Sequence, residues 1–203
     1  MFITLEGIDG SGKSTQAALI KDVLQQRGYK VLLTREPGGT EVGDQIRELV
    51  LDRKKSDSVK PHTELLLFCA SRAQLVSEVI QPWLNRGRGH VVVCDRYADS
   101  TLAYQGYGQG LDLDQLHVIL RFATQGLTPD LTLYLDLAPE IGLERRRTAS
   151  LLHSRDFNRL DAMKLAFHQR VHAGYEQLIA QTPQRWRRIN ADQSEQAVHA
   201  AIV

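Results

Sequence analysis

The chain has 203 residues, enough for one large domain with a substantial core, and its 42% hydrophobic and 24% charged residues are typical of a globular protein. A formal net charge of +1 provides no overall field to attract nucleic acid or an anionic membrane. No apolar run approaches the roughly 18 residues that a membrane span needs, and no signal peptide fits before the first strand. Cys69 and Cys94 lie in apolar runs and indicate buried free thiols of a reducing compartment, so we expect a cytoplasmic protein.

The first apolar, β-prone run, residues 2–6, leads into a glycine-rich loop that matches G-x-x-x-x-G-K-[ST] at every fixed position. The loop consists of Gly7, Ile8, Asp9, Gly10, Ser11, Gly12, Lys13, Ser14 and Thr15. Its glycines let backbone N–H groups turn inward around a phosphate, and the following helix start adds partial positive charge. Lys13 would reach the β- and γ-phosphates of a nucleotide, and the Ser14 hydroxyl would face Mg²⁺. The alternative is a glycine turn that matches by chance, but position, context and residue types all favour a nucleotide-phosphate site.

A helix is expected over residues 14–27, and Gly28 supplies its C-terminal stop. Its expected buried stripe consists of Ala18, Leu19, Val23 and Leu24. The second strand, residues 29–34, runs directly into Arg35-Glu36-Pro37-Gly38-Gly39-Thr40. Charged residues and paired glycines at the carboxyl end of a strand lie where ligands bind in open parallel sheets.

A long helical segment is expected over residues 62–85, with a kink or break near Pro82. It follows a shorter helix and a polar run that predicts a solvated connector, at residues 40–51 and 52–60. Within the long segment, Phe68 and Arg72 are four residues apart and share one face. From spacing alone, a core phenylalanine beside a surface arginine is the favoured interpretation of this pair.

The β-branched run at residues 91–94 is typical of a buried parallel strand, and it ends in Asp95. An acidic residue at the tip of such a strand, in a chain with a phosphate loop, is a candidate for the magnesium shell. The alternative is that Asp95 only caps the end of the strand.

The remaining chain continues the alternation of strands and helices. The expected elements are a polar segment rich in aromatic residues and glycine at 100–110, a helix at 114–126, a strand at 131–136, a helix from Pro139 to Arg147, a helix at 162–180, a strand at 186–190 and a closing helix. With right-handed crossovers, this order predicts one α/β domain spanning residues 1–203. The expected fold is a P-loop NTPase three-layer α/β/α sandwich around a five-stranded parallel sheet.

A group of arginines follows the fourth strand, at positions 145, 146, 147, 155 and 159. A guanidinium group over the transferring phosphoryl oxygens offsets developing charge, and a closing segment excludes water. Residues 145–161 are therefore a candidate lid. For any single arginine of the group, the alternative is an ordinary solvated face.

Four segments carry a family resemblance, and R-E-P-G-G together with Y-Q-G is its most specific part. The segments are Thr34 through Thr40, Asp95-Arg96-Tyr97, Ser100 through Gly106, and Pro129-Asp130-Leu131-Thr132. In this order they resemble the bacterial thymidylate kinases, and the resemblance covers essentially the whole chain. It implies transfer of the γ-phosphate of ATP to dTMP with Mg²⁺ as cofactor, usually by a homodimer whose other partners are these small molecules.

The resemblance also implies an acceptor site. Phe68 would stack on thymine and Arg72 would hydrogen-bond its edge, which overturns the surface interpretation of Arg72. Ser100 and Gln105 would also approach the base, and Tyr104 would lie under the sugar. Arg47 and Arg96 would hold the acceptor phosphate, and Asp9 would face the 3′-hydroxyl or the phosphate network. Glu36, with Pro37 beside it, would lie near the metal and the acceptor phosphate.

Two details of the resemblance concern subtype. Some family members carry an arginine inside the phosphate loop, whereas this chain has Gly10 and Ser11 there. The catalytic arginine is then expected from the lid, as Arg155 or Arg159. Gln109 is a departure, because related sequences often carry arginine after Y-Q-G-x-x.

Three other functions are considered. A GTPase-type switch needs D-x-x-G after its metal strand and a guanine-reading N-K-x-D, and the chain contains neither. A kinase for another nucleoside monophosphate stays open, because base choice depends on the transferred roles. A non-catalytic nucleotide-binding regulator is disfavoured by the complete set of Lys13, Ser14 and Asp95.

Overall fold

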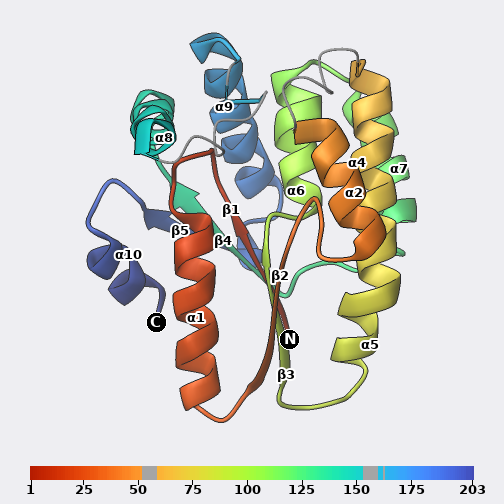
Figure 1. The fold of residues 1–203 in the computed structure, drawn as a ribbon, viewed down its shortest axis with the longest axis vertical. Coiled ribbons are helices and arrows are strands. Elements are labelled where there is room, and N and C mark those ends of the chain that lie inside the picture. Colours follow the sequence, from red (N-terminus) through yellow and green to blue (C-terminus); the bar gives the residue numbers. More distant parts are fainter. Residues whose placement is uncertain (52–58, 153–159, 162) are drawn as a thin grey trace.

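Five parallel strands form the centre of the computed structural model, which describes residues 1–51, 59–152, 160–161 and 163–203, without the side chains of 150–152. The strands are β1 (Phe2–Glu6), β2 (Lys30–Arg35), β3 (His90–Asp95), β4 (Leu131–Asp136) and β5 (Trp186–Asn190). Their spatial order is β2-β3-β1-β4-β5, so β1 is the central strand (Figure 1). The predicted five-stranded parallel sheet is confirmed.

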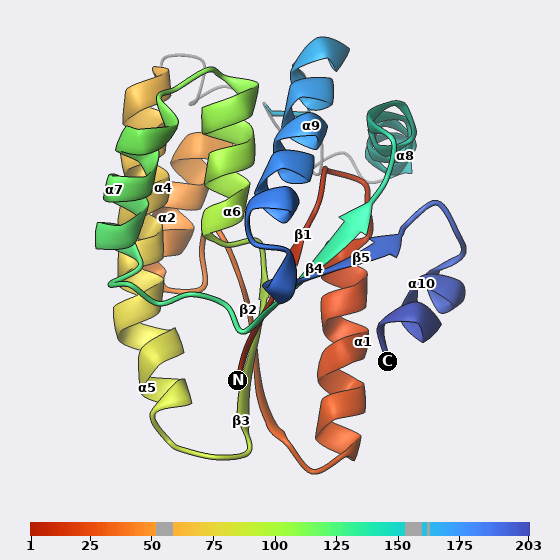
Figure 2. The same ribbon diagram turned by 180° about the vertical axis from the view of Figure 1, so that it is seen from behind.

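Helices cover both faces of this sheet, with α1 in front of it in Figure 1 and α9 in front of it in Figure 2. The helices are α1 (Lys13–Gln26), α2 (Glu41–Leu51), α4 (Pro61–Leu75), α5 (Gln81–Leu84), α6 (Ala98–Thr101), α7 (Leu113–Ala123), α8 (Pro139–Leu152), α9 (Leu165–Gln181) and α10 (Glu195–Ile202). Two π-helical segments, η1 (Val76–Ile80) and η2 (Leu102–Gly108), and a short 3₁₀ turn, η3 (Pro183–Arg185), complete the order. This is the predicted three-layer α/β/α arrangement.

The core explains why the central strands carry apolar residues on both of their faces. Successive side chains of a strand point to opposite faces, and both faces of this sheet are covered. Val91 and Val93 join one buried cluster, whereas Val92 and Cys94 join another. Cys94 and Cys69 are buried free thiols, as predicted. Among the described residues, no helix combines the length and the apolar character needed to cross a membrane.

Two helices differ from the predicted pattern. The buried face of α1 carries Ala17 and Ile20, whereas Ala18 is exposed. The predicted stripe was therefore wrong at Ala18, whereas Leu19, Val23 and Leu24 are half-buried and Leu24 packs against the core. The helix α8 continues to Leu152, beyond its expected end at Arg147.

The long helical segment contains a widened turn just before Pro82. The helix α4 passes through the π-helical segment η1 before α5 begins with Pro82 near its first residue. Proline lacks a backbone N–H, and its ring would clash with the carbonyl group four residues earlier, so a widened turn relieves the conflict. The chain stays helical from Pro61 to Leu84, so the irregularity expected near Pro82 is a π-helical turn and not a break. The polar connector is predicted for residues 52–60, and positions 52–58 lie outside the described residues.

The end of β4 is joined to β5 and α9 by a charged cluster. Asp136, His172 and Glu176 lie close enough together to suggest metal ligands. However, Arg188 forms ion pairs with both Asp136 and Glu176, and so provides the positive charge between the two carboxylates. The cluster is therefore explained as a tether of the outer strand β5 to the sheet and helix behind it.

Candidate active site

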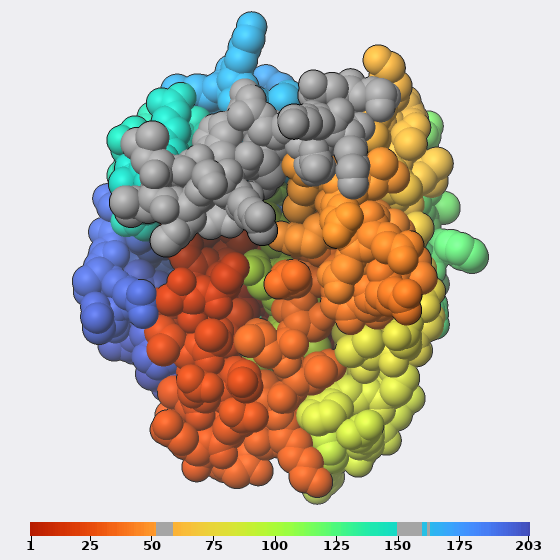
Figure 3. Space-filling view, viewed as in Figure 1, coloured from red at the N-terminus to blue at the C-terminus, as the bar shows by residue number. Residues whose placement is uncertain are grey.

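A cavity of about 490 Å³ opens at the carboxyl ends of β1, β2 and β3. Figure 3 shows a hollow between α1 with its preceding loop and α2. The lining residues come from the glycine-rich loop, from the segments after β2 and β3, and from α4, η2 and α8. Open parallel sheets bind ligands at this edge, so the fold itself indicates where to search for a site.

The glycine-rich loop packs tightly against the start of α8. Gly10 has φ +83°, and a Cβ atom there would lie 2.3 Å from the carbonyl oxygen of Gly142. Lys13 folds over the loop and donates from Nζ to the Ile8 carbonyl oxygen at 2.8 Å. Burial, followed by the nearby Arg96 charge, lowers the pKa of Lys13 to about 8. A bound anion would relieve this strain, which is what a phosphate-binding lysine requires.

A hydroxyl and a carboxylate meet beside this loop in an arrangement that suits a magnesium ion. Ser14 at the start of α1 donates from Oγ to Oδ2 of Asp95 at the end of β3. The other oxygen of Asp95, Oδ1, is buried and has no hydrogen-bond partner among the described residues. Hard oxygen ligands of this kind are those that Mg²⁺ prefers, so the donor set fits the expected ion.

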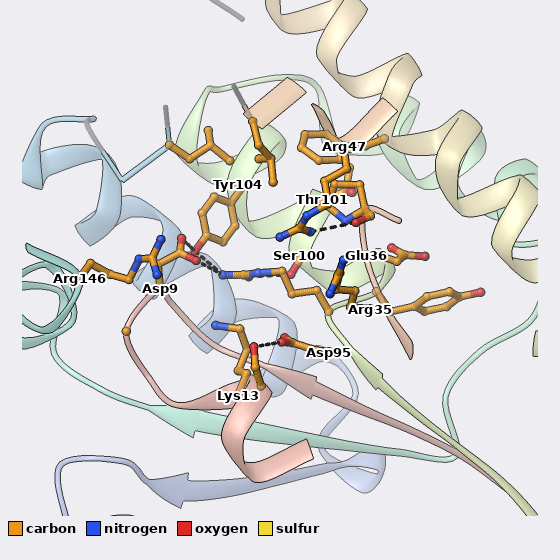
Figure 4. A pocket seen from close by; sticks show the side chains of 18 of the residues that line it. Asp9, Lys13, Arg35, Glu36, Arg47, Asp95, Ser100, Thr101, Tyr104 and Arg146 are labelled. Atoms are coloured by element: carbon orange, nitrogen blue, oxygen red, sulfur yellow. Dashed lines mark hydrogen bonds and ion pairs between the residues drawn. The ribbon is translucent and has the colours of Figure 1, made fainter. Parts of the chain in front are cut away.

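Arg96 lies at the centre of the opposite wall. It has φ +73°, a conformation that few residues other than glycine adopt. Its Nη2 donates to Oδ1 of Asp9 at 2.7 Å and to the Tyr104 hydroxyl at 3.0 Å, and its Nη1 donates to Oγ of Ser100 at 2.9 Å. Burial alone would raise the pKa of Asp9, but the charges of Arg96 and Lys13 hold it well below its usual range. Figure 4 shows Asp9 and Tyr104 together on this wall.

A buried ion pair closes the deeper end of the cavity, where Phe68 also lies. Arg72 is 2% exposed and donates from Nε and Nη2 to Oε2 of Glu36, at 2.8 and 2.6 Å. Burial would lower the pKa of Arg72, but the Glu36 carboxylate raises it above its ordinary value. The Arg72 Nη1 and the Glu36 Oε1 are buried without partners among the described residues, so one donor and one acceptor are left unpaired. The surface interpretation of Arg72 from spacing alone was wrong.

Two further arginines face the same cavity from the β2 side. Arg47 on α2 donates from Nη1 to the Pro37 carbonyl oxygen at 2.9 Å. Burial, followed by the charge of Arg35, lowers the pKa of Arg47. Like charges held close together are unfavourable unless an anion joins them, so this wall is suited to a phosphate group.

A family model described as thymidylate kinase matches residues 5–202. The chain belongs to the thymidylate kinase family. The thymidylate kinase of Roseiflexus castenholzii is 56% identical over 210 residues, covering 100% of this chain and 90% of that protein. That of Herpetosiphon aurantiacus is 51% identical over 211 residues, covering 94% and 88%. A crystal structure of thymidylate kinase from Ehrlichia chaffeensis has a TM-score of 0.78 at 33% identity, covering 100% of this chain and 95% of that one.

The cavity of this thymidylate kinase family member brings together most of the predicted site residues. Those that line it are Asp9, Gly10, Gly12, Lys13, Ser14, Thr15, Glu36, Pro37, Arg47, Phe68, Arg72, Asp95, Arg96, Ser100, Tyr104 and Gln105. Gly7, Ile8 and Ser11 belong to the loop but do not line the cavity, and Ile8 and Ser11 are buried beneath it. The predicted lid arginines Arg155 and Arg159 lie outside the described residues.

Some residues in or behind the cavity wall were given no individual role from the sequence. Arg35 was part of the R-E-P-G-G motif, and its position directly after a strand was a usable signal. Arg146 was one of the clustered arginines, and it lines the cavity while bonding to Asp161. The buried Glu6 had no signal at all, because it ends an apolar run and looks like part of the strand.

Gln109, the departure from the family pattern, has a defined neighbour. Its Nε2 donates to Oε1 of Glu64 at 2.7 Å, and Nε2 of Gln105 donates to the same oxygen at 2.7 Å. Gln109 therefore belongs to the layer of contacts that holds Gln105 in the cavity wall.

Proposed function

We propose that this chain is an ATP-dependent thymidylate kinase that transfers the γ-phosphoryl group of ATP to dTMP, giving dTDP and ADP for DNA precursor synthesis. The observation that carries the proposal is the single cavity in which a phosphate loop faces a second, arginine-rich wall with an aromatic end. Family membership across residues 5–202 supports it, and so do the names of the relatives. A donor and an acceptor site at one cavity are what a phosphotransferase needs.

The donor half binds the triphosphate. Backbone N–H groups of the loop would surround the phosphates, and Lys13 would turn from the Ile8 carbonyl oxygen toward the β- and γ-phosphates. Ser14 and Asp95, with Glu36 nearby, would hold Mg²⁺. When bound, this ion would neutralise charge on the β- and γ-oxygens.

The acceptor half binds dTMP. Phe68 would stack on thymine, and the unpaired Nη1 of Arg72 would donate to an oxygen of the base edge. Ser100 and Gln105 lie toward the base in this proposal, and Tyr104 lies under the sugar, where it would exclude a 2′-hydroxyl. Arg47 and Arg96 would hold the phosphate with Pro37 beside them, and Asp9 would face the 3′-hydroxyl or the phosphate network.

The chemistry then requires alignment more than acid or base catalysis. Both phosphates are anionic, and the acceptor phosphate is already a nucleophile near neutral pH, so the site mainly has to align and neutralise them. Arg96, Lys13 and a lid arginine, Arg155 or Arg159, would provide the positive charge. We also propose that residues 1–203 act as one domain, with a lid at about 145–161 that excludes water.

A homodimer in the cytoplasm completes the proposal. Three large apolar side chains are exposed on the neighbouring helices α4 and α7 (Figure 2), at 58% for Leu66, 71% for Val118 and 86% for Phe122. Val118 and Phe122 are four residues apart, so they point the same way from α7. An exposed apolar face of this kind supports pairing with a second copy of the chain. The free buried thiols support a reducing compartment.

The test is a coupled ADP-release assay with Mg²⁺-ATP and a panel of monophosphates that includes dTMP, dUMP, dCMP and AMP. The expected result is turnover with dTMP that exceeds turnover with dCMP and AMP by at least about 100-fold, because a site that pairs with base-edge groups rejects bases lacking them. Chelation of Mg²⁺ should abolish the activity. Activity that is absent with dTMP but present with dCMP or AMP would overturn the assignment in favour of another monophosphate kinase.

A further inference from the structure

A fully buried carboxylate lies directly behind Arg96. Glu6 is the last residue of the central strand β1 and is 0% exposed. Its Oε1 accepts from the backbone N–H of Tyr97 at 2.8 Å, and its Oε2 accepts from the hydroxyls of Ser100 and Tyr175 at 2.6 and 2.8 Å. Burying a carboxylate costs free energy, and these three hydrogen bonds offset only part of it, since burial still raises the pKa of Glu6.

The same two hydroxyls hold Arg96. Its Nη1 donates to Oγ of Ser100 at 2.9 Å and lies 3.4 Å from the hydroxyl oxygen of Tyr175. A hydroxyl has one proton and its oxygen can accept. When the hydroxyls of Ser100 and Tyr175 both donate hydrogen bonds to Glu6, their oxygens are free to accept hydrogen bonds from the guanidinium group of Arg96.

We propose that Glu6 is a positioning residue for phosphoryl transfer, which fixes Arg96 by orienting the hydroxyls of Ser100 and Tyr175 toward it. The inference rests on the proposed function, in which Arg96 holds the acceptor phosphate. Arg96 is thereby held at both of its terminal nitrogens. Asp9 and Tyr104 accept from its Nη2, and the hydroxyls of Ser100 and Tyr175 contact its Nη1. A guanidinium group fixed in advance loses little freedom when the phosphate binds.

The strand gives Glu6 a rigid base. In the sheet register, Glu6 pairs with Tyr134 on β4. The next residue, Gly7, leaves no room for movement, since a Cβ atom there would lie 2.6 Å from the Leu135 carbonyl oxygen. Catalytic groups held by packed strands are placed more accurately than those on loops.

Several charged side chains from neighbouring elements act on Glu6. Burial, followed by Asp99 on α6, raises the pKa of Glu6 to about 7, against the opposing charge of Arg96. Asp99 is itself paired with Arg185 at 2.7 Å, and Lys13 on α1 also interacts with Glu6. Glu6 and Arg96 are therefore coupled through charge as well as through the two hydroxyls.

The competing explanation is purely structural, because Glu6 also accepts from Tyr97 at the start of α6 and would serve as a cap there. The two explanations differ in what Glu6→Gln does. A glutamine has one acceptor oxygen, and the backbone N–H of Tyr97 cannot turn away from it, whereas a hydroxyl can rotate. The amide nitrogen then faces Ser100 and Tyr175, so both hydroxyls must turn their protons away from it. A structural cap would alter stability and leave the acceptor site as it was.

The experiment measures KM for dTMP, KM for ATP and kcat in wild type, Glu6→Gln, Tyr175→Phe and the double variant. We expect Glu6→Gln to raise KM for dTMP about 10-fold or more, the scale of one hydrogen bond to a charged group, with KM for ATP within about twofold. In the Tyr175→Phe background the effect of Glu6→Gln should shrink at least about threefold, because both act on one guanidinium group. Equal effects on the two substrates, or fully additive effects, would overturn the proposal.

Thr4→Val is the matched control. Thr4 lies two residues earlier on β1, is 0% exposed, and shares a buried hydrogen bond with Thr132 at 2.9 Å. Its loss should lower stability without changing KM for dTMP, and a rise like that of Glu6→Gln would overturn the proposal. Should Glu6→Gln fail to fold, Tyr175→Phe alone must raise KM for dTMP, since it removes one of the two hydroxyls.

Arg96→Lys separates this inference from the proposed function. If it raises KM for dTMP while Glu6→Gln leaves it unchanged, the positioning role fails and the proposed function stands. If Arg96→Lys leaves KM for dTMP unchanged in an enzyme that phosphorylates dTMP, the role of Arg96 fails and that of Glu6 with it. If the wild type does not phosphorylate dTMP, the proposed function itself fails.

Discussion

At the residue scale, the cavity contains buried and half-buried charges that pair with one another without substrate. Arg96 pairs with Asp9 and Arg72 pairs with Glu36, and Lys13 and Glu6 add one buried charge of each sign. The left-handed backbone of Arg96 adds strain of the kind that persists only where surrounding contacts enforce it. The site therefore lowers the stability of the fold, but its charged groups are already positioned before a substrate binds.

Glu6 should make stability depend on pH. Its pKa is raised from 4.5 to about 7 in the folded chain, so the folded state keeps a proton that the unfolded state releases between these values. The free energy of unfolding should therefore fall as pH rises from 4.5 to 7, by an amount on the order of 3 kcal/mol.

Urea unfolding of wild type and Glu6→Gln across this pH window checks the prediction. Groups common to both proteins cancel in the difference between their unfolding free energies. The free energy of unfolding of Glu6→Gln should increase relative to that of wild type as pH rises. A difference that stays flat from pH 4.5 to 7.5 would contradict the raised pKa.

Lys13→Ala should lose at least about 100-fold in kcat, the scale of one lost electrostatic contact in the transition state. The reason is that Lys13 is the buried cation of the phosphate loop. The measurement is steady-state turnover at saturating ATP and dTMP. Lys30→Ala is the control, because Lys30 is an exposed lysine at the start of β2, and it should keep normal turnover. A Lys13→Ala enzyme with near-normal kcat would remove the role assigned to that residue.

At the scale of elements, the sequence predicted what local patterns specify. The continuous apolar runs of β1 and β3 and the glycine-rich loop are determined by near neighbours, so all were predicted. The π-helical segment η2 was not, because its residues combine glycine and aromatic side chains that match no period. Its shape depends on packing against α9, because Gly108 at the end of η2 lets Phe167 of α9 approach closely.

Spacing alone missed the burial of Arg72 for a related reason, and only the family resemblance assigned it to the site. Nothing within α4 marks Arg72 as internal, since its partner Glu36 lies 36 residues earlier after β2. The same holds for Glu6, whose partners Ser100 and Tyr175 come from α6 and α9. Long-range pairs of this kind become visible only when the sheet brings their elements together.

The contact between α8 and the phosphate loop gives a prediction at this scale. A Cβ atom on Gly142 would lie 2.5 Å from the Asp9 carbonyl oxygen and 2.7 Å from Cδ1 of Ile8. Gly142→Ala should therefore push the loop aside, raising KM for ATP several-fold and costing about 1–3 kcal/mol of stability. ATP titration and thermal unfolding measure the two effects.

Gly174→Ala is the matched control, because it is also a helical glycine whose Cβ atom would clash, at 2.7 Å from Tyr107. It should cost similar stability and leave KM for ATP unchanged. If both variants change KM for ATP equally, the effect reflects general loosening and the loop contact has no special part.

At the scale of the whole molecule, α4 connects the site with the surface. Its inner face carries Phe68 and Arg72 into the cavity, and it also exposes Leu66, while the neighbouring helix α7 exposes Val118 and Phe122. A second copy bound to these exposed side chains would also hold α4. Assembly and acceptor binding would then depend on the same helix.

Phe122→Asp should convert the proposed homodimer to a monomer, because it replaces the most exposed of these three apolar side chains with a charge. Light scattering after size exclusion should give twice the mass of one chain for wild type and a single chain for the variant. The wild-type thermal midpoint should rise with protein concentration, and that of the variant should not. Tyr29→Asp, at an exposed aromatic away from this face, should remain dimeric. A wild type that is already a monomer, or a Phe122→Asp variant that remains a dimer, would move the interface elsewhere or remove it.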